Sequence, residues 1–316
     1  MYRHLKFPAL LCLVWLASTA PGFAVDQHSP ERLERVAFGS CNQVKLEQPL
    51  WPAIVAWDPD LWIWTGDIIY ADTSVEARMR AMYEEQKARP GYRGLLAHCP
   101  VIGVWDDHDY GLNGGGKEFK AREMSQRALL DFLDEPSGSP RRSRAGVYAS
   151  YTWGPADART KIILLDARYH RERPGAEADT LGAEQWRWLE SELRDSDASL
   201  NLIVSSYQVV ASDHSYEKWA NFPHSRARLL ALIRENHVPG VIFISGDRHI
   251  GEISRETRAT AYPLYDITAS GLTHSWSSFP GEPNERRVSE VITDLHFGAM
   301  SITWGSETVD LELQLI

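Results

Sequence analysis

The segment that says most about this chain is Leu61-Trp62-Ile63-Trp64-Thr65-Gly66-Asp67-Ile68-Ile69-Tyr70. Its short apolar run is typical of a buried β-strand, and the run ends at a glycine followed by side chains that can bind a metal ion. Four other apolar runs also end in a cluster of polar side chains that can bind a metal ion, two of them with a glycine and two without: Phe38–Asn42, Ser245–His249, Trp105–Asp109 and Leu165–Arg168. Because ligands of α/β sheets bind beyond the carboxyl ends of the strands, we expect these clusters to converge in space.

Apolar, β-branched runs alternate with segments of helical periodicity along the rest of the chain. Strands are expected at residues 35–40, 61–65, 100–105, 147–153, 161–166, 201–205, 241–245, 262–268, 298–304 and 307–315, and Gly305-Ser306 predicts a hairpin between the last two. Helices are expected at residues 48–57, 74–87, 117–133, 183–194 and 224–235. The alternation indicates an α/β fold, and the strand-only end of the chain indicates a mixed sheet.

The first 24 residues have the features of a secretory signal peptide. Arg3 and Lys6 precede a short apolar run, and small residues before Ala24 offer a cleavage site. A buried N-terminal helix is the alternative. Residues 25–316 are then expected to form a single domain in the periplasm or outside the cell. No later segment approaches the ~18 apolar residues of a membrane span, so none is expected.

The charge of the chain is strongly acidic. Asp and Glu total 43 against 33 Lys and Arg, and removal of residues 1–24 changes the formal net charge from −10 to −12. Bulk charge therefore excludes attraction to nucleic acid and leaves acidic groups that bound cations can neutralise. Cleavage also leaves two cysteines, Cys41 and Cys99, which allows either one disulfide or two core thiols.

Taken together, the strand-end clusters resemble the alkaline phosphatase D (PhoD-like) family of the calcineurin-like metallophosphoesterase superfamily. Ser40-Cys41-Asn42 stands where the superfamily has Asp-x-His, and Tyr70 ends a motif that begins Gly66-Asp67. Trp105-Asp106-Asp107-His108-Asp109 and Gly246-Asp247-Arg248-His249 match two later motifs, so the resemblance runs from residue 38 to residue 249. It implies a four-layer α/β/β/α sandwich with mixed sheets.

The resemblance also implies a site for two kinds of metal ion. A thiolate and a phenolate suit ferric iron, and carboxylates suit calcium. The implied iron ligands are Cys41, Asp67, Tyr70 and His249, and the implied calcium ligands are Asp67 as a bridge, Asp107 and Asp247, with Gln208 as a candidate oxygen donor. One or two calcium ions are compatible with the family. If Cys41 is a ligand, it makes no disulfide with Cys99.

Further residues are implied in catalysis. His108 is expected to protonate the leaving alkoxide, with Asp109 orienting it and raising its pKa. Arg168 is either a phosphate clamp or a structural salt bridge at a strand end. Asn113 and His274 are expected to line the substrate site. Three aromatic residues are candidates for a wall against the organic arm of a diester: Trp105, Tyr207 and Trp276.

These expectations add up to an exported, monomeric phosphoesterase that hydrolyses phosphate mono- or diesters, of alkaline phosphatase or phosphodiesterase type. A related phospholipase or nucleotidase would differ only in its leaving group. The alternative from another class is a catalytically inactive calcium-binding or surface-binding protein on the same fold, although the presence of His108 and Asp109 argues against it. A serine hydrolase is disfavoured because no Gly-x-Ser-x-Gly elbow is present.

Overall fold

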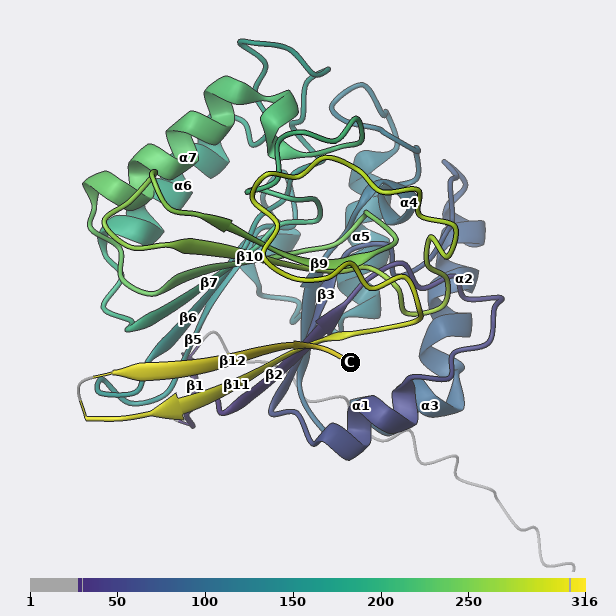
Figure 1. Ribbon diagram of the computed structural model, residues 1–316. Coiled ribbons are helices and arrows are strands. Elements are labelled where there is room, and N and C mark those ends of the chain that lie inside the picture. The colour runs from purple at the N-terminus through teal and green to yellow at the C-terminus, as the bar shows by residue number, and fades with distance from the viewer. Residues whose placement is uncertain (1–27, 30, 307) are drawn as a thin grey trace, which may run out of the picture.

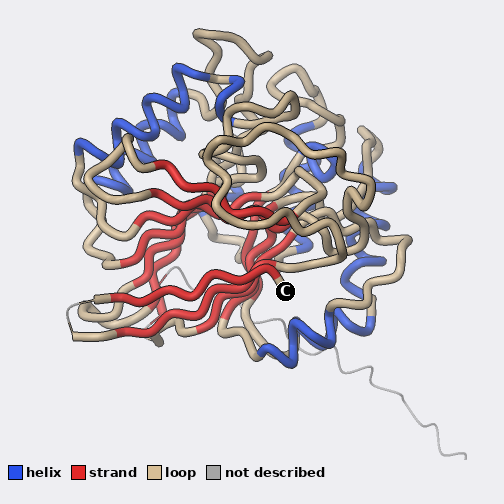
Figure 2. Tube along the Cα trace, viewed as in Figure 1, coloured by secondary structure: helices blue, strands red, loops and turns tan. Residues whose placement is uncertain are grey.

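The computed structural model describes residues 28–29, 31–306 and 308–316, so the expected signal peptide at residues 1–24 lies outside the described residues. Two β-sheets pack face to face, and helices cover the outer face of each (Figures 1 and 2). This is the α/β/β/α sandwich that the sequence predicts, and the expected fold class is confirmed.

The larger sheet has seven strands in the order β1-β5-β6-β7-β8-β10-β9. Its four central strands β6, β7, β8 and β10 run parallel to one another, whereas β5 is antiparallel to β6 and β9 is antiparallel to β10; the short β1 pairs with β5 in parallel. The strands of this sheet are β1 (His28–Ser29), β5 (Ala149–Trp153), β6 (Thr160–Leu164), β7 (Leu200–Val204), β8 (Val241–Ser245), β9 (Gly251–Glu256) and β10 (Leu264–Ala269).

The smaller sheet has five strands in the order β12-β11-β2-β3-β4. Here β2, β3 and β4 are parallel, and the expected hairpin of β11 and β12 adds two antiparallel strands beside β2. The strands are β2 (Arg35–Gly39), β3 (Leu61–Thr65), β4 (Val101–Val104), β11 (Gly298–Trp304) and β12 (Val309–Leu315). Both sheets are therefore mixed, as expected.

The helices form the two outer layers. One group covers the smaller sheet and consists of α1 (Trp51–Trp57), α2 (Glu76–Ala88), α3 (Pro90–Leu96) and α5 (Arg122–Phe132). The other group, α6 (Ala183–Arg194) and α7 (Pro223–Glu235), covers the larger sheet (Figure 1). The single turn α4 (Asp107–Tyr110) follows β4, and two 3₁₀ turns, Pro140–Arg142 and Trp219–Asn221, lie in loops.

Side-chain alternation along the strands divides the core into three layers. In β3, Ile63 packs between the two sheets, whereas Trp62 and Trp64 pack against the helices on the smaller sheet. In β6, Ile162 packs between the sheets and Ile163 faces α6 and α7. Successive side chains of a strand point to opposite faces, so a strand buried on both faces is apolar throughout. This is why the sequence shows continuous apolar runs at these positions.

Every expected strand and helix is present, but the expected helix at residues 117–133 begins only at Arg122. Strand β9 was not expected from the sequence, because one of its buried faces is polar: Glu252 and Ser254 are buried and pair with residues of the loop at 284–287. Helix α3 was also missed. It contains Gly91, where a Cβ atom would lie 2.7 Å from the Cβ of Trp51. A glycine is therefore present in this helix because α1 packs closely against it, although glycine has a low helix propensity.

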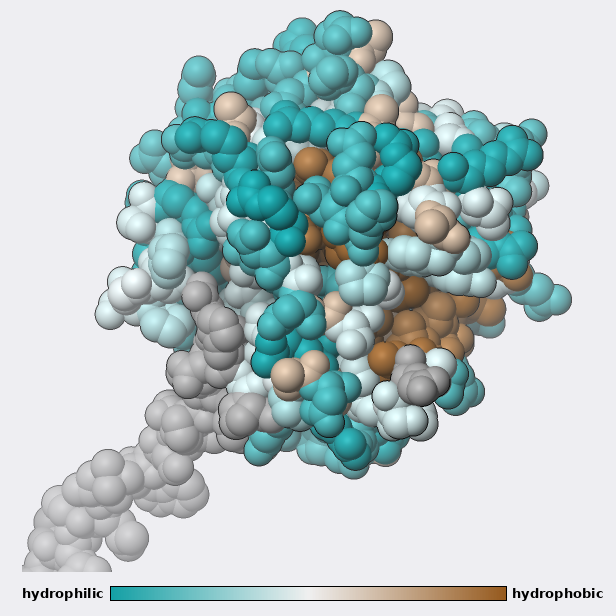
Figure 3. All heavy atoms as spheres, turned by 90° about the vertical axis from the view of Figure 1, so that its left-hand side faces the viewer, coloured by the Kyte–Doolittle hydropathy of each residue, from teal (hydrophilic) through white to brown (hydrophobic). Residues whose placement is uncertain are grey.

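The surface is mostly hydrophilic. In the view of Figure 3, apolar atoms show between the hydrophilic ones. Partly buried side chains of the edge strand β12, among them Leu311 and Leu313, cover part of the layer between the sheets. No helix in the described part of the chain has the length and apolar character needed to cross a bilayer.

Candidate metal centre

The polar residues that follow β2, β3, β4 and β8 meet at one edge of the two sheets. Three groups have possible metal-binding atoms within 4.8 Å of one another: Cys41 with Asp67 and His249, Asp67 with Asp107 and His108, and Asp106 with Asp107 and Asp247. Asp67 belongs to the first two groups, so its carboxylate lies between them. The strand ends converge as the sequence predicts.

Tyr70 lies in the first group as well. Its hydroxyl donates to Asp67 Oδ2 at 3.2 Å and lies 3.1 Å from His249 Nε2. The Cys41 thiol lies 3.6 Å from the same Asp67 oxygen. The four expected iron ligands are therefore in mutual contact. Both Cys41 and Cys99 are free thiols, and Cys99 is part of the core under the helices of the smaller sheet.

Backbone conformation in the turns is unusual at these positions. Cys41, Asp67, Asp247 and His249 all have positive φ angles, of 59°, 49°, 69° and 55°. Residues other than glycine rarely adopt this region, and such residues cluster at functional sites, where the surrounding structure holds them. Sharp left-handed turns directly after the strands are what bring these side chains into one place.

The centre carries more negative charge than the surrounding side chains neutralise. Burial raises the pKa of Asp67 well above its usual range, and the nearby Asp107 raises it further. Burial also raises the pKa of Asp106 to about 6. Within the described residues, Asp67 Oδ1 and Asp106 Oδ2 are buried without a hydrogen-bond partner. Bound cations would neutralise these carboxylates and use the free oxygen atoms, so the donor set fits metal ions.

His108 lies at the edge of this centre, and its hydrogen-bond partner is not the expected one. Its Nδ1 lies 2.9 Å from both oxygens of Asp72. Burial disfavours the imidazolium, but the hydrogen bond with Asp72 and the negative charges of Asp107, Asp72 and Asp106 together outweigh it and raise the pKa of His108. Its ring also packs on that of Tyr70, with centroids 4.0 Å apart.

The expected role of Asp109 in orienting His108 is wrong. The Asp109 carboxylate is fully buried and accepts hydrogen bonds from the backbone N–H groups of Ile68, Ile69 and Asp106, at 2.9–3.1 Å. Its side chain therefore ties the turn after β3 to the start of α4. As the third residue of a one-turn helix, it points back toward the N-terminus of that helix and away from the His108 ring.

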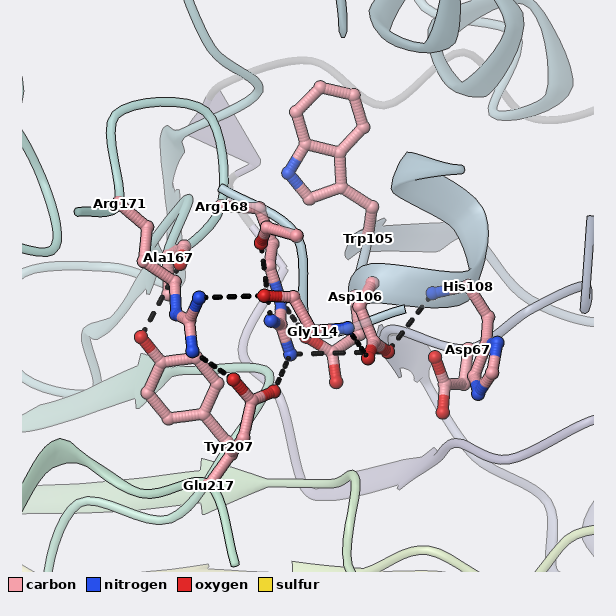
Figure 4. A network of polar contacts seen from close by, with 12 residues as sticks. Asp67, Trp105, Asp106, His108, Gly114, Ala167, Arg168, Arg171, Tyr207 and Glu217 are labelled. Atoms are coloured by element: carbon pink, nitrogen blue, oxygen red, sulfur yellow. Dashed lines mark hydrogen bonds and ion pairs between the residues drawn. The ribbon is translucent and has the colours of Figure 1, made fainter. Parts of the chain in front are cut away.

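Arg168 is fully buried in a network of charges (Figure 4). Its Nε donates to Asp106 Oδ1 at 2.6 Å, and one of its terminal amines donates to Glu217 Oε2 at 2.6 Å. Arg171 pairs with the other oxygen of Glu217. Arg168 does not line the pocket beside the metal centre. Of the two roles considered for it, this placement favours the structural salt bridge over the phosphate clamp.

Three other expected residues lie away from the pocket. The Gln208 amide is buried and donates to Glu252 and Thr268, at 2.6 and 2.8 Å, so the structure directs it toward β9 and β10. Trp105 and Tyr207 are fully buried in the core and cannot form a substrate wall. The sequence could not distinguish these three residues from the residues that line the pocket, because both sets include residues that come directly after apolar strands.

A pocket of about 520 Å³ opens over the metal centre. Asn113, expected to bind substrate, lines it. His274 does not, but its ring lies 4.5 Å from that of His249 and 5.1 Å from that of Tyr70, measured between centroids. The remaining lining residues are Asp67, Asp107, His108, Gly114, Tyr216, Glu217, Asp247, Arg248, His249 and Trp276.

Among these lining residues, Tyr216, Glu217 and Arg248 were not expected from the sequence, and neither was Asp72 beside the pocket. Tyr216 and Glu217 lie in a loop that follows no strand directly, and Asp72 lies five residues beyond Asp67. The one feature of the sequence that could have pointed to this part of the pocket is Tyr216, an aromatic residue in an otherwise polar loop.

The two-sheet sandwich and its acidic centre at the strand ends define an α/β protein with a candidate metal centre. The model of the PhoD-like phosphatase family matches residues 36–270, which include all the strand-end clusters described above. The chain belongs to the PhoD-like phosphatase family.

Parts of this chain are similar to known proteins in sequence and in structure. Alkaline phosphatase D of Bacillus subtilis (strain 168) is 22% identical over 203 residues, which are 54% of this chain and 34% of that protein. The chain thus spans about a third of the length of this curated relative. The solved structure of PhoD has a TM-score of 0.65 at 17% identity, over 94% of this chain and 73% of that one.

Two further structures share the fold at low identity. GAP50 of Plasmodium, described as the anchor in the inner membrane complex, has a TM-score of 0.60 at 14% identity, over 90% of this chain and 85% of that one. A dimetal phosphatase from Danio rerio has a TM-score of 0.55 at 15% identity, over 89% of this chain and 99% of that one.

Proposed function

We propose that this protein is a metal-dependent phosphoesterase that hydrolyses phosphate mono- or diesters. The observation that carries the proposal is the convergence of Cys41, Asp67, Asp107, Asp247 and His249 beneath an open pocket. Asp67 lies where a carboxylate can bridge two cations. Membership of the PhoD-like phosphatase family and the relative named alkaline phosphatase D support the same reaction.

We further propose that the cations are ferric iron and calcium. Cys41, Asp67 and Tyr70 offer anionic donors and His249 an imidazole, a set suited to ferric iron, and Asp67, Asp107 and Asp247 offer the oxygen donors that calcium prefers. Asp106 also lies within reach of the second set, which is compatible with more than one calcium ion. When bound, two cations activate a water nucleophile and neutralise phosphoryl oxygens.

His108 is the proposed general acid. It lines the pocket, and its hydrogen bond with Asp72 is among the contacts that raise its pKa against the effect of burial, and the raised pKa favours the protonated form of the ring. A proton at this position can be given to the departing alkoxide oxygen, which makes the alkoxide a better leaving group. Asn113 on the same pocket wall offers an amide that can bind the ester oxygens.

A second candidate function is binding without catalysis, because one protein with this fold, GAP50, is described as an anchor. The presence of both a pocket histidine with a raised pKa and the full donor set favours catalysis for this chain.

The test combines metal analysis with turnover. Purified protein should contain iron and calcium and hydrolyse bis(4-nitrophenyl) phosphate or 4-nitrophenyl phosphate, and a thiolate and phenolate on ferric iron should colour it. Asp67→Asn should lose most of the bound metal and nearly all activity, because among the described residues Asp67 is the carboxylate that the group with Cys41 and His249 shares with the group with Asp107 and His108. Full metal content with no turnover on either ester in the wild type would favour the binding-only function. Normal turnover and metal content in Asp67→Asn would show that the bridge lies elsewhere.

We also propose that residues 1–24 direct export to the periplasm or the medium. Expression of the full chain in a bacterium, followed by N-terminal sequencing of the exported protein, should give a start at Val25. Retention of the intact chain in the cytoplasm would contradict this proposal.

A further inference from the structure

One wall of the pocket is aromatic. Tyr216 and Trp276 line it side by side, with ring centroids 5.6 Å apart in an edge-to-face arrangement. Trp276 in turn packs edge-on against Phe279, with centroids 5.2 Å apart. The same pocket is lined by the carboxylates of the metal centre and by His108, so an ester bound over the metal centre shares the pocket with these two rings.

Tyr216 is left unusually open to solvent. Its exposed fraction is 45%, and it is the one aromatic residue among the large exposed apolar side chains of the described residues. Most aromatic residues of this protein are buried in the core, where their large apolar surface stabilises the fold. An exposed ring at the mouth of a pocket is instead typical of a surface that binds a ligand.

The surroundings of Tyr216 hold its ring in place. The Arg248 guanidinium lies over one ring face, 4.3 Å from the centroid, and is itself held by an ion pair with Glu282. The next residue, Glu217, is held by Arg168 and Arg171. Because the ring is supported on one face and its backbone is anchored, a ligand that packs on it pays little ordering entropy.

We propose that Tyr216 and Trp276 form a subsite for a planar aromatic arm of the ester substrate, an inference that rests on the phosphoesterase function proposed above. Stacking on Tyr and Trp favours flat rings over saturated groups of the same size. The shared chemistry is a flat aromatic group, which an aryl ester and a nucleoside ester both supply. The protein therefore prefers aromatic phosphoesters to aliphatic ones.

The test uses diesters that share 4-nitrophenolate as leaving group and differ in the retained arm: phenyl, cyclohexyl, and thymidine 5′-linked. Wild-type KM should be lower for the phenyl and thymidine esters than for the cyclohexyl ester. Tyr216→Ala and Trp276→Leu should raise KM for the phenyl ester by about tenfold while kcat changes little, and should abolish the preference over cyclohexyl. Tyr216→Phe retains the ring and should retain the preference.

A matched control is Leu46→Ala, which removes an exposed apolar side chain outside the pocket lining and should leave both KM values unchanged. If the alanine and leucine variants change KM equally for phenyl and cyclohexyl esters, or change neither, the subsite is disproved. A thymidine ester with lower KM than the phenyl ester assigns the arm to a nucleobase, and the reverse order assigns it to an aryl group.

Equilibrium binding of phenylphosphonate and cyclohexylphosphonate separates the subsite from the reaction, because neither compound can be hydrolysed. The metal-loaded wild type should bind phenylphosphonate about tenfold more tightly, and Tyr216→Ala should lose this difference. If no ester is hydrolysed but the binding preference is present, the subsite is upheld and the proposed reaction is not. Equal binding of the two phosphonates would disprove the subsite whatever the activity.

Discussion

At the scale of single residues, His108 combines three contacts. Its Nδ1 lies 2.9 Å from Asp72, its ring packs on Tyr70, and its side chain lines the pocket. Asp72 has a φ angle of 41°, so the turn itself brings this carboxylate back toward His108. The proton on His108 is thus held by a residue that is not part of the proposed iron and calcium ligand sets.

His108→Ala should therefore affect esters according to their leaving groups. Alkyl phosphoesters need a proton on the departing oxygen, so their kcat should fall by ~10²–10⁴-fold. Nitrophenyl esters leave without that proton and should lose far less. Steady-state kinetics on one alkyl and one nitrophenyl ester, with metal content measured in parallel, checks this. Equal losses on both esters with the metals intact would point to phosphate binding by His108 and not to acid catalysis.

Asp72→Asn serves as the matched variant, because it keeps the size of the side chain and removes its charge. The hydrogen bond with Asp72 raises the pKa of His108, so its loss should lower that pKa. The alkyl esters should then lose activity at a lower pH than in the wild type. An unchanged pH profile would mean that Asp72 does not set the proton affinity of His108.

The sequence correctly predicted which residues converge at the metal centre, but it did not predict the hydrogen-bond partner of His108. Cys41, Asp67, Asp247 and His249 directly follow buried parallel strands, so their convergence depends only on sheet topology. The partner of His108 is Asp72 and not the expected Asp109, and this difference depends on left-handed turns and on a one-turn helix. Such conformations arise from packing between loops, and no local pattern specifies them.

At the scale of elements, the turn after β3 packs directly on the turn after β4. Gly66 has a φ angle of +102°, and a Cβ atom at this position would lie 2.5 Å from the Cβ and 2.7 Å from the backbone N of Asp106. Two of the three hydrogen bonds accepted by Asp109, those from Ile68 and Ile69, join the same two turns. The metal centre is therefore shaped by contact between two loops and not by either loop alone.

Gly66→Ala should destabilise the protein by about 2 kcal/mol or more, because both the φ angle and the space at this position disfavour a Cβ atom. Gly94→Ala is the matched control. Gly94 lies within α3 and has open space around it, so alanine there should be neutral or stabilise by up to about 1 kcal/mol. Urea unfolding of both variants checks the pair, and equal midpoints would show that the turn has room to adjust.

Strand β9 shows where hydrophobic pattern fails at this scale. The sequence predicts strands by their apolar faces, but Glu252 and Ser254 occupy the buried face here and are satisfied by Arg287 and Asn284. These partners lie more than 25 residues away along the chain, so the burial of β9 becomes intelligible only once the loop at 284–287 is placed.

At the scale of the whole molecule, buried carboxyl groups make the metal-free protein sensitive to pH. Burial raises the pKa of Asp106 to about 6 and that of Asp109 to about 7, both above the value of about 4 expected in the unfolded chain. A group with a raised pKa stabilises the fold fully below its unfolded pKa and loses that contribution as pH rises through its folded pKa.

We therefore expect the free energy of unfolding in the presence of a chelator to fall from about pH 4 to about pH 7, relative to the metal-loaded protein. Cations neutralise the ionised carboxylates, so the stability gained from metal should grow over the same range by more than about 1 kcal/mol. Urea midpoints at several pH values, with and without metal, check this. If the difference in urea midpoint between the metal-loaded and the metal-free protein became smaller as the pH rises, the proposed excess of negative charge at the centre would be contradicted.

The anchoring of Glu217 by two buried arginines has a consequence for how such proteins diversify. The loop that carries Tyr216 is held through the ion pairs of Glu217. We therefore expect Ser215 and Tyr216 to tolerate substitution without disturbing the ion pair of Arg168 with Asp106. The proposed metal centre and the proposed aromatic subsite thereby lie on different parts of the chain. A lineage, or a laboratory library, can explore new substrates by mutation of residues 215, 216 and 276 while it inherits the same catalytic machinery intact.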